Sequence, residues 1–359
     1  MLEEVKNISG LPEFDSHKAI YRFEDGVNNL RGFIAIHNDN LGPATGGTRM
    51  FPYVSEDDAL RDVLKLSRAM TYKCALAGVR HGGAKGVIIA DPESDKNERL
   101  LRAYAKMVNE LKGKFYTGED VGLTEDDVQI MLQESKFFIG KRGVAGDPSP
   151  FAALSVFYAM ETVLNEVMEK GNFFSIKVAI KGIGKVGSEL LRLLMRAGAK
   201  AVTADIKASV ADSIRLKFPQ VKIVRPEAIH KQNADIFSPC ALGNDITNAN
   251  VSDIQAQIIC GGANNQLESS EVGDLLFKRK IFYVPDYVAN AGGLINVVDE
   301  LEKGGYKRER VLHRIEHLKD TLRTLYLFSQ QKNQPPHRIA DKLAEDIFKN
   351  GPSGTISML

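Results

Sequence analysis

Cysteine is scarce in this sequence of 359 residues, and its few occurrences are widely separated. Cys74, Cys240 and Cys260 form no CxxC motif. This spacing argues against a zinc cluster and against the disulfide framework of a small secreted protein. We therefore expect buried, free thiols, no bound metal and a reducing, cytoplasmic location.

An excess of charge of either sign and a long apolar run are also missing. Lys and Arg number 47 against 46 Asp and Glu, for a net charge of +1. This balance argues against a nucleic-acid partner. No stretch of 18 apolar residues is present, so we expect no membrane span, and residues 1–14 lack the pattern of a signal peptide. The length predicts about two domains.

Two lysines lie twelve positions apart in KCALAGVRHGGAKGVIIADP, residues 73–92. Lys85 follows Gly82–Gly83, a pair that lets a ligand approach the backbone closely. GVIIA, residues 86–90, predicts a short buried strand with Lys85 at its mouth. Burial there would lower the pKa of Lys85 and let it act as a base, whereas the alternative is an exposed lysine beside a turn.

The surrounding residues predict alternating strands and helices. A strand over 32–38 is followed by a Gly/Pro loop over 42–52 and by a helix that Ser55 caps. Lys73 lies near the end of that helix, where a cation also has a purely structural explanation. Later segments predict a helix over about 98–111, a strand KFYTGED that ends at Gly118–Asp120, and a helix opened by a Thr124–Asp127 capping box. KRGVAGDPSP, residues 141–150, predicts a hinge, followed by a helix over 150–169.

The second half opens with a complete dinucleotide-binding unit. A strand KVAIK, the glycine turn GIGKVG at 182–187, a helix and a second strand ending at Asp205 follow in order. Gly182 would make the turn, Gly184 would admit a pyrophosphate, and Gly187 would let helix and strand pack closely. Asp205 would accept hydrogen bonds from the ribose hydroxyls and repel a 2′-phosphate, which favours NAD over NADP, although Lys207 opposes this preference. The main alternative is another ligand of the same fold, such as S-adenosylmethionine.

Further strand-like segments cover 234–242, 256–267 and 281–297. Their small residues and Asn264, Asn265 and Asn290 would face the cofactor, or else simply form turns. The tail predicts two helices, the first with an apolar stripe formed by Val311, Ile315, Leu318, Leu322 and Leu325.

Together these segments resemble the amino-acid dehydrogenase family that acts on glutamate, leucine, phenylalanine and valine, with the leucine type most similar. The resemblance rests on GPATGGTRM, MTYKCALAG, GGAKGVIIADP, TGEDVG, GIGKVG, SPCALG, GGANNQL and PDYVANAGGLINV, in that order. It implies an α/β fold with a substrate domain over 1–146, a Rossmann domain over 147–329, a deep cleft between them, and a return of 330–359 to the first domain. It also implies a homo-oligomer, either a dimer or an octamer.

The resemblance implies a role for each matching residue. Lys85 would be the catalytic lysine, Asp120 its acid/base partner, and Lys73 the anchor of the substrate carboxylate. The other substrate-binding residues would be Thr45, Gly46, Gly47, Gly118, Leu294 and Val297. The residues that bind NAD would be Gly182, Gly184, Lys185, Val186, Gly187, Asp205, Ile206, Cys240, Ala241, Leu242, Ala263, Asn264, Asn265 and Asn290.

Two positions depart from the family pattern. Ala152 stands where leucine-type members usually carry a Thr near the nicotinamide. Arg80 and His81 stand where uncharged residues are expected, and we interpret His81 as a local variation, with tuning of Lys85 as the alternative. These departures leave open a catalytically silent NAD-binding homologue.

The resemblance also bears on the substrate. Glutamate-type members carry a Lys where this chain has Thr45 and a Ser where it has Val297, and those groups hold the distal carboxylate of glutamate. A mostly apolar pocket is expected here, which favours leucine, valine or isoleucine. A phenylalanine- or tryptophan-like substrate is the alternative, because Gly118 and Thr45 leave room for it.

Overall fold

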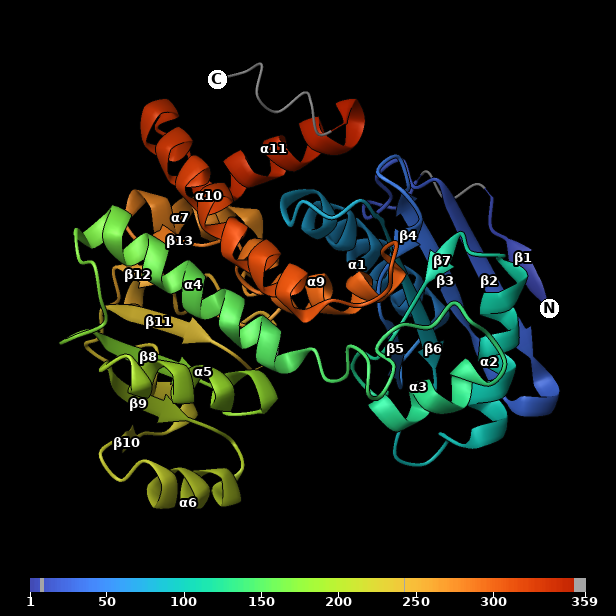
Figure 1. Ribbon diagram of the computed structural model, residues 1–359, viewed down its shortest axis with the longest axis horizontal. Coiled ribbons are helices and arrows are strands. Elements are labelled where there is room, and N and C mark those ends of the chain that lie inside the picture. The colour runs from blue at the N-terminus through green and yellow to red at the C-terminus, as the bar shows by residue number, and fades with distance from the viewer. Residues whose placement is uncertain (7–9, 242, 352–359) are drawn as a thin grey trace. The chain divides into compact units, whose positions relative to one another are not determined.

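The computed structural model describes residues 1–6, 10–241 and 243–351, which divide into two compact units (Figure 1). The first unit holds Met1–Asp147, Asn296–Arg308 and the residues from Leu343 on. The second unit holds Pro148–Ile295 and Glu309–Lys342. Compared with the predicted boundaries, residues 296–308 therefore belong with the first unit, and residues 330–342 belong with the second.

A mixed sheet forms the centre of the first unit. Its strands are β1 (Leu2–Glu4), β2 (Ala19–Asp25), β3 (Leu30–Asn38), β4 (Ala44–Thr45), β5 (Thr48–Phe51), β6 (Gly82–Ile89) and β7 (Phe115–Tyr116). They lie in the order β1-β2-β3-β6-β4-β7, with β5 also paired to β6. The pairs β1–β2, β2–β3 and β3–β6 are antiparallel, whereas β4 and β5 run parallel to β6.

Helices cover both faces of this sheet. Strand β6 alternates, so that Val87 packs with residues of α1 (Glu56–Leu76), whereas Ile88 packs with residues of α2 (Glu98–Glu110). Lys85 is two residues from Val87 and therefore lies on the α1 face. The helix α3 (Glu125–Leu132) contacts α2, and two short 3-10 turns, η1 (Gly26–Asn28) and η4 (Asp299–Leu301), complete this unit's regular structure.

The predicted helix starts are confirmed. The Ser55 side chain accepts a hydrogen bond from the Asp58 amide, and Thr124 and Asp127 form both bonds of a capping box. The predicted loop over 42–52 is wrong, because β4 and β5 lie within it. The strands are short, and Gly42, Pro43, Gly46 and Gly47 lie beside them, so the segment as a whole has the composition of a loop.

The second unit holds a parallel sheet of the Rossmann type. Its strands are β8 (Lys177–Lys181), β9 (Lys200–Ala204), β10 (Lys222–Ile223), β11 (Ile236–Pro239), β12 (Ile258–Ile259) and β13 (Phe282–Tyr283). They lie in the order β10-β9-β8-β11-β12-β13, all parallel. In chain order this is 3-2-1-4-5-6, the arrangement of dinucleotide-binding sheets, so the predicted fold class is confirmed.

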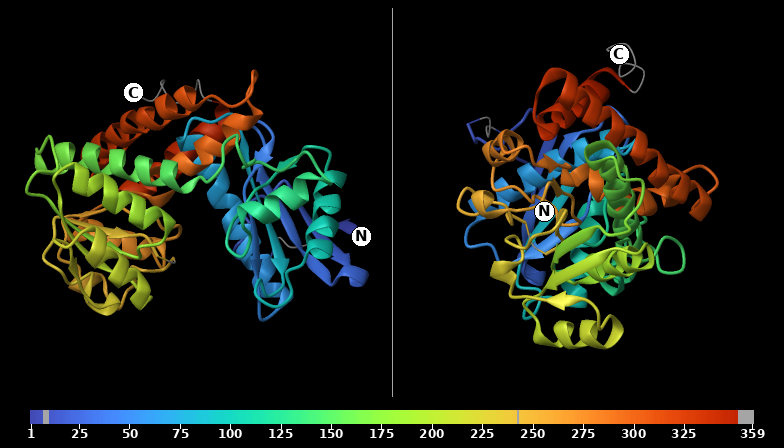
Figure 2. Two further views of the ribbon diagram at one scale, coloured as in Figure 1. Left: turned by 60° about the horizontal axis from the view of Figure 1, so that its bottom comes forward. Right: turned by 90° about the vertical axis from the view of Figure 1, so that its left-hand side faces the viewer.

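Helices surround this sheet. They are α4 (Ser149–Met168), α5 (Lys185–Arg196), α6 (Ala208–Lys217), α7 (Ser270–Lys278), α8 (Asp286–Ala289), α9 (Gly292–Val298), α10 (Arg308–Lys332) and α11 (Pro336–Asn350), with short turns η2 (Pro226–Ala228) and η3 (Val251–Asp253). Helices α4 and α5 pack against each other (Figure 2). The ends of α9, α10 and α11 belong to the first unit.

The C-terminal third departs from the predicted strands. The predicted strand over 281–297 is wrong beyond Val284, because Pro285 is followed by the helices α8 and α9. Pro lacks the amide that a strand needs and is well suited to the start of a helix. In contrast, the predicted apolar stripe of α10 is buried as expected.

One described helix, α4, is long and apolar enough to cross a membrane, with a mean hydropathy of 1.2 over an 18-residue window. Half of that window is buried within the protein, as in the core helix of a soluble protein.

Candidate active site and nucleotide site

The first unit brings Lys85 and Asp120 together. The Lys85 ammonium contacts Oδ2 of Asp120, from the loop after β7. The other carboxylate oxygen, Oδ1, accepts a hydrogen bond of 2.6 Å from the Val121 amide. Lys85 lies within β6 and not at its mouth, because β6 begins at Gly82, and its side chain is only 7% exposed. The alternative of an exposed lysine is wrong.

Burial strongly affects the charge of this lysine. Removal from water lowers the pKa of Lys85 well below 10.5, and the cations of Arg49 and Lys73 lower it further. Asp62 acts in the opposite direction. The Asp120 carboxylate favours the charged form at contact distance, but the loss of hydration and the two cations give the net direction.

Arg49 was missed by the sequence reasoning. Its guanidinium donates a 3.0 Å hydrogen bond to Asp62 through Nη1, and its Nη2 lies 3.9 Å from Oδ1 of Asp120. The only sequence signal for a role of Arg49 is its position in the GPATGGTRM motif. The residues around it do not indicate that β5 places it beside Asp120.

Gly46 and Gly47 lie where any side chain would collide with this site. A Cβ at Gly46 would lie 1.8 Å from the Ala84 carbonyl oxygen, and a Cβ at Gly47 would lie 3.0 Å from the Cβ of Asp120. Both glycines therefore allow the turn between β4 and β5 to lie against Lys85's strand and Asp120's loop.

Thr45 has a polar partner that the sequence did not reveal. Its hydroxyl lies 3.0 Å from Nδ1 of His81, which also lies 3.2 Å from the Pro43 carbonyl oxygen. Because a carbonyl only accepts, the bond to Pro43 favours the tautomer in which Nδ1 carries the proton. Thr45 and His81 are both buried. Thr45 pairs with Gly83 on β6, and so shares a sheet face with Lys85.

The remaining predicted substrate residues are distributed over several elements. Lys73 lies in the last turn of α1, and its charge acts on Lys85. A Cβ at Gly118 would lie 2.8 Å from the Ile139 carbonyl oxygen, so backbone packing already requires glycine there. Leu294 and Val297 lie three residues apart on α9, and their place in the pocket stays a prediction.

The glycine turn of the second unit has the predicted geometry. Gly182 has φ of +91°, and a Cβ at Gly187 would lie 2.0 Å from the Gly182 carbonyl oxygen. Gly184 is the N-cap of α5, with open space where a Cβ would project. Lys185 and Val186 form the first turn of α5, and the N-terminus of a helix favours a phosphate.

Asp205 lies directly after β9 and closes this turn. Its carboxylate accepts hydrogen bonds from the amides of Ile183, at 2.7 Å, and Lys207, at 2.9 Å. The neighbouring Ile206 is 86% exposed, which is unusual for a large apolar side chain and leaves its surface free for a flat ligand such as adenine.

The predicted residues after β11 and β12 also gather near the turn. The backbone of Ala241 lies against Gly182, and Cys240 lies against Gly187. Leu242 lies outside the described residues. Asn290 donates to the carbonyl oxygens of Gly262 and Ala263 and to the side chain of Asn264, whereas Asn265 adopts a positive φ in the same loop.

These residues fit a nicotinamide dinucleotide. Oδ1 of Asn290 is buried and lacks a partner, so it offers an acceptor for an amide such as the nicotinamide carboxamide. Gly184 and the start of α5 leave space for the pyrophosphate. Asp205 lies at the end of the second strand, where such an acid accepts hydrogen bonds from the ribose hydroxyls. Within the described ranges, no group of three or more metal-binding side chains occurs.

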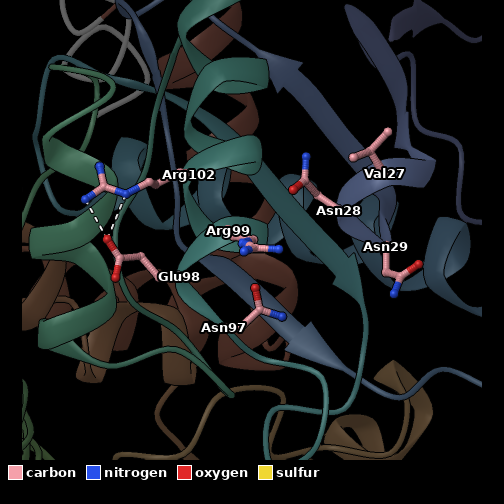
Figure 3. A pocket seen from close by; sticks show the side chains of 7 residues that line it. All are labelled: Val27, Asn28, Asn29, Asn97, Glu98, Arg99 and Arg102. Atoms are coloured by element: carbon pink, nitrogen blue, oxygen red, sulfur yellow. Dashed lines mark hydrogen bonds and ion pairs between the residues drawn. The ribbon is translucent and has the colours of Figure 1, made fainter.

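A separate hollow of the first unit contains none of the predicted site residues (Figure 3). It has a volume of about 650 Å³ and is lined by Val27, Asn28, Asn29, Asn97, Glu98, Arg99 and Arg102. Arg102 is already paired with Glu98 and Glu134 across it.

Two family models match the chain. The Glu/Leu/Phe/Val dehydrogenase dimerisation domain matches residues 16–137, and the Glutamate/Leucine/Phenylalanine/Valine dehydrogenase model matches residues 207–344.

Characterised relatives match nearly the whole chain. Leucine dehydrogenase of Geobacillus stearothermophilus is 41% identical, over 90% of this chain and 88% of the relative. Phenylalanine dehydrogenase of Thermoactinomyces intermedius is 42% identical, over 93% and 92%. The crystal structure of L-tryptophan dehydrogenase from Nostoc punctiforme is 38% identical with a TM-score of 0.80, over 94% and 97%. The chain therefore belongs to the Glu/Leu/Phe/Val dehydrogenase family, whose members depend on NAD(P), and is an amino-acid dehydrogenase that uses NAD.

Proposed function

We propose that this chain catalyses the reversible, NAD-dependent oxidative deamination of a neutral hydrophobic L-amino acid to its 2-oxo acid and ammonia. The observation that carries the proposal is the buried contact between Lys85 and Asp120. Burial lowers the pKa of Lys85, so this lysine loses its proton at a lower pH than an exposed lysine and can act as the base in the hydrolysis of an iminium group.

Each residue has a distinct task in this proposal. Lys73 binds the substrate carboxylate as a fixed cation. Neutral Lys85 takes a proton from the water that attacks the iminium carbon, and Asp120 passes that proton on. Bound NAD supplies the acceptor for the hydride from the substrate α-carbon.

The side-chain preference follows from the charges that the pocket lacks. Neither Thr45 nor Val297 provides a cation for the distal carboxylate of glutamate. A buried carboxylate without a partner costs several kcal/mol, enough to exclude glutamate. With Gly118 and Leu294, these positions favour leucine, valine and isoleucine.

An aromatic substrate is the second candidate. The leucine, phenylalanine and tryptophan dehydrogenases match at similar identity. The proposed pocket would also have a polar end, because the Thr45 hydroxyl lies 3.0 Å from Nδ1 of His81. Such an end suits a side chain with its own polar group, such as an indole.

The proposal also includes assembly and location. We expect a homo-oligomer in the cytoplasm, either a dimer or an octamer. Light scattering at micromolar concentration would give a multiple of 39.5 kDa, and a monomer mass would contradict this.

The central experiment measures NADH formation with the twenty L-amino acids and NAD at mildly alkaline pH. Values of kcat/KM for leucine, valine, phenylalanine, tryptophan and glutamate are then compared. The highest kcat/KM with leucine or valine supports the proposal, whereas the highest kcat/KM with phenylalanine or tryptophan favours the second candidate. Glutamate as the best substrate refutes the pocket argument, and no rate with any amino acid refutes the activity.

A further inference from the structure

Arg49 lies between two carboxylates on the catalytic face of the first unit. Its Nη1 donates to Asp62 at 3.0 Å, and its Nη2 lies 3.9 Å from Oδ1 of Asp120. Its side chain is 20% exposed, so the guanidinium is largely removed from water. Charges interact more strongly in such a setting than at an open surface.

Asp62 and Tyr53 hold this arginine in place. The Tyr53 hydroxyl donates a 2.5 Å hydrogen bond to the same Oδ2 of Asp62 that accepts from Arg49. Burial raises the pKa of Tyr53, and the bond to Asp62 raises it further, so the hydroxyl keeps its proton. One carboxylate oxygen thus receives two donors and fixes the direction of the guanidinium.

The fold explains why these residues meet. Arg49 pairs with Val87 on β6, which places it on the α1 face of the sheet, as Lys85 is. Asp62 reaches that face from α1. The loop that carries Asp120 runs beside β5, because the Thr48 amide donates to Gly118 and the Met50 amide donates to Val121.

We propose that Arg49, held by Asp62 and Tyr53, is a positioning residue that orients the Asp120 carboxylate toward Lys85 and sets the charge around the pair. With one carboxylate oxygen facing Arg49 and the Val121 amide, the other is left for Lys85. The inference rests on the proposed proton exchange at Lys85 and adds a residue that does not itself contact substrate.

The charges around Lys85 give the expected sign. They are Arg49 from β5, Lys73 and Asp62 from α1, and Asp120 from the loop after β7. Loss of the Arg49 cation removes repulsion from protonated Lys85, so its pKa rises. The neutral, active form then appears only at higher pH.

The test compares pH profiles of kcat/KM for Arg49→Met and wild type, with NAD and the best amino acid of the panel. The limb of the profile over which kcat/KM rises with pH should move about one pH unit higher in Arg49→Met. At a pH below this limb, kcat/KM should therefore be about tenfold lower than in wild type. Arg49→Lys keeps the charge but loses the second donor. It should keep the limb near its wild-type position while kcat falls severalfold.

Arg22→Met is the matched control. Arg22 also lies in the first unit and bridges two carboxylates, Glu24 and Glu56, but not Asp120. Its loss should leave the limb in place. A limb that does not move in Arg49→Met overturns the inference.

If circular dichroism shows that Arg49→Met is unfolded, Arg49→Lys tests the inference instead. Arg49→Lys with both the wild-type limb and the wild-type kcat overturns the inference. A wild-type enzyme inactive toward all twenty amino acids is a different result, and refutes the proposed function instead.

Discussion

Lys85 and Asp120 contact each other through Nζ and Oδ2, although 35 positions separate them in the chain. Lys85 is held within β6, and Asp120 lies in the loop after β7, the strand that pairs with β4. The sheet thus brings a cation and a carboxylate together with little access of water, and the predictions below depend on that pair.

Removal of the lysine amine should abolish turnover without affecting the nucleotide site. Lys85→Ala is expected to lose amino-acid oxidation while the Kd for NAD stays near wild type, since the residues predicted to bind NAD lie in the second unit. Steady-state kinetics and fluorescence titration with NADH measure the two effects. The control is Lys96→Ala, which breaks a similar Lys–Asp pair in the first unit, with Asp127, and should keep kcat.

Asp120→Asn removes the charge of the partner but keeps its shape. We expect kcat to fall on the order of 10²-fold or more, as for other losses of a general acid or base. KM should change much less, because substrate binding is assigned to Lys73. Asp126→Asn provides a control, since that carboxylate is exposed and pairs with the surface residue Arg142. Wild-type kcat in Asp120→Asn would show that the relay is wrongly assigned.

Activity should depend on pH with a defined sign. Because burial lowers the pKa of Lys85 below 10.5, neutral lysine forms at lower pH than for an exposed lysine. The neutral form is the base, so kcat/KM should rise with pH through this pKa and level off before 10.5. If kcat/KM still rises at pH 10.5, as it would for a lysine with an ordinary pKa, the assignment of Lys85 as the base is wrong.

Asp205 should determine the choice between NAD and NADP. Asp205→Ala removes the carboxylate that would repel a 2′-phosphate, so the ratio of kcat/KM for NAD to that for NADP should fall. Some loss with both cofactors is expected, because Asp205 also accepts from the amides of Ile183 and Lys207. Asp212→Ala on α6 is a surface control. A wild-type enzyme that prefers NADP would refute this prediction directly.

Local signals in the sequence were reliable guides to part of the fold. The turn at Gly182, the close packing at Gly187, the N-caps Ser55 and Thr124, and the apolar stripe of α10 are all as predicted, because neighbouring residues determine each of them. The order of motifs likewise predicted the family correctly.

Two segments of the chain were predicted with the wrong secondary structure. β4 and β5 were predicted as a loop, and the segment after Val284 was predicted as a strand although it forms α8 and α9. For β4 and β5, pairing with β6 outweighs local preference. The helix α8 instead follows from Pro285, a local signal that argues against a strand.

The sequence by itself determined the family, the Rossmann unit and the identity of the lysine and carboxylate at the proposed site. Only the tertiary structure decided what surrounds them. Arg49 acts on Asp120, and His81 bonds to Thr45, because β4, β5 and β6 lie side by side. The pKa of Lys85 and the polarity of the pocket depend on such neighbours, and distances between segments far apart in the chain are set only when the sheet assembles.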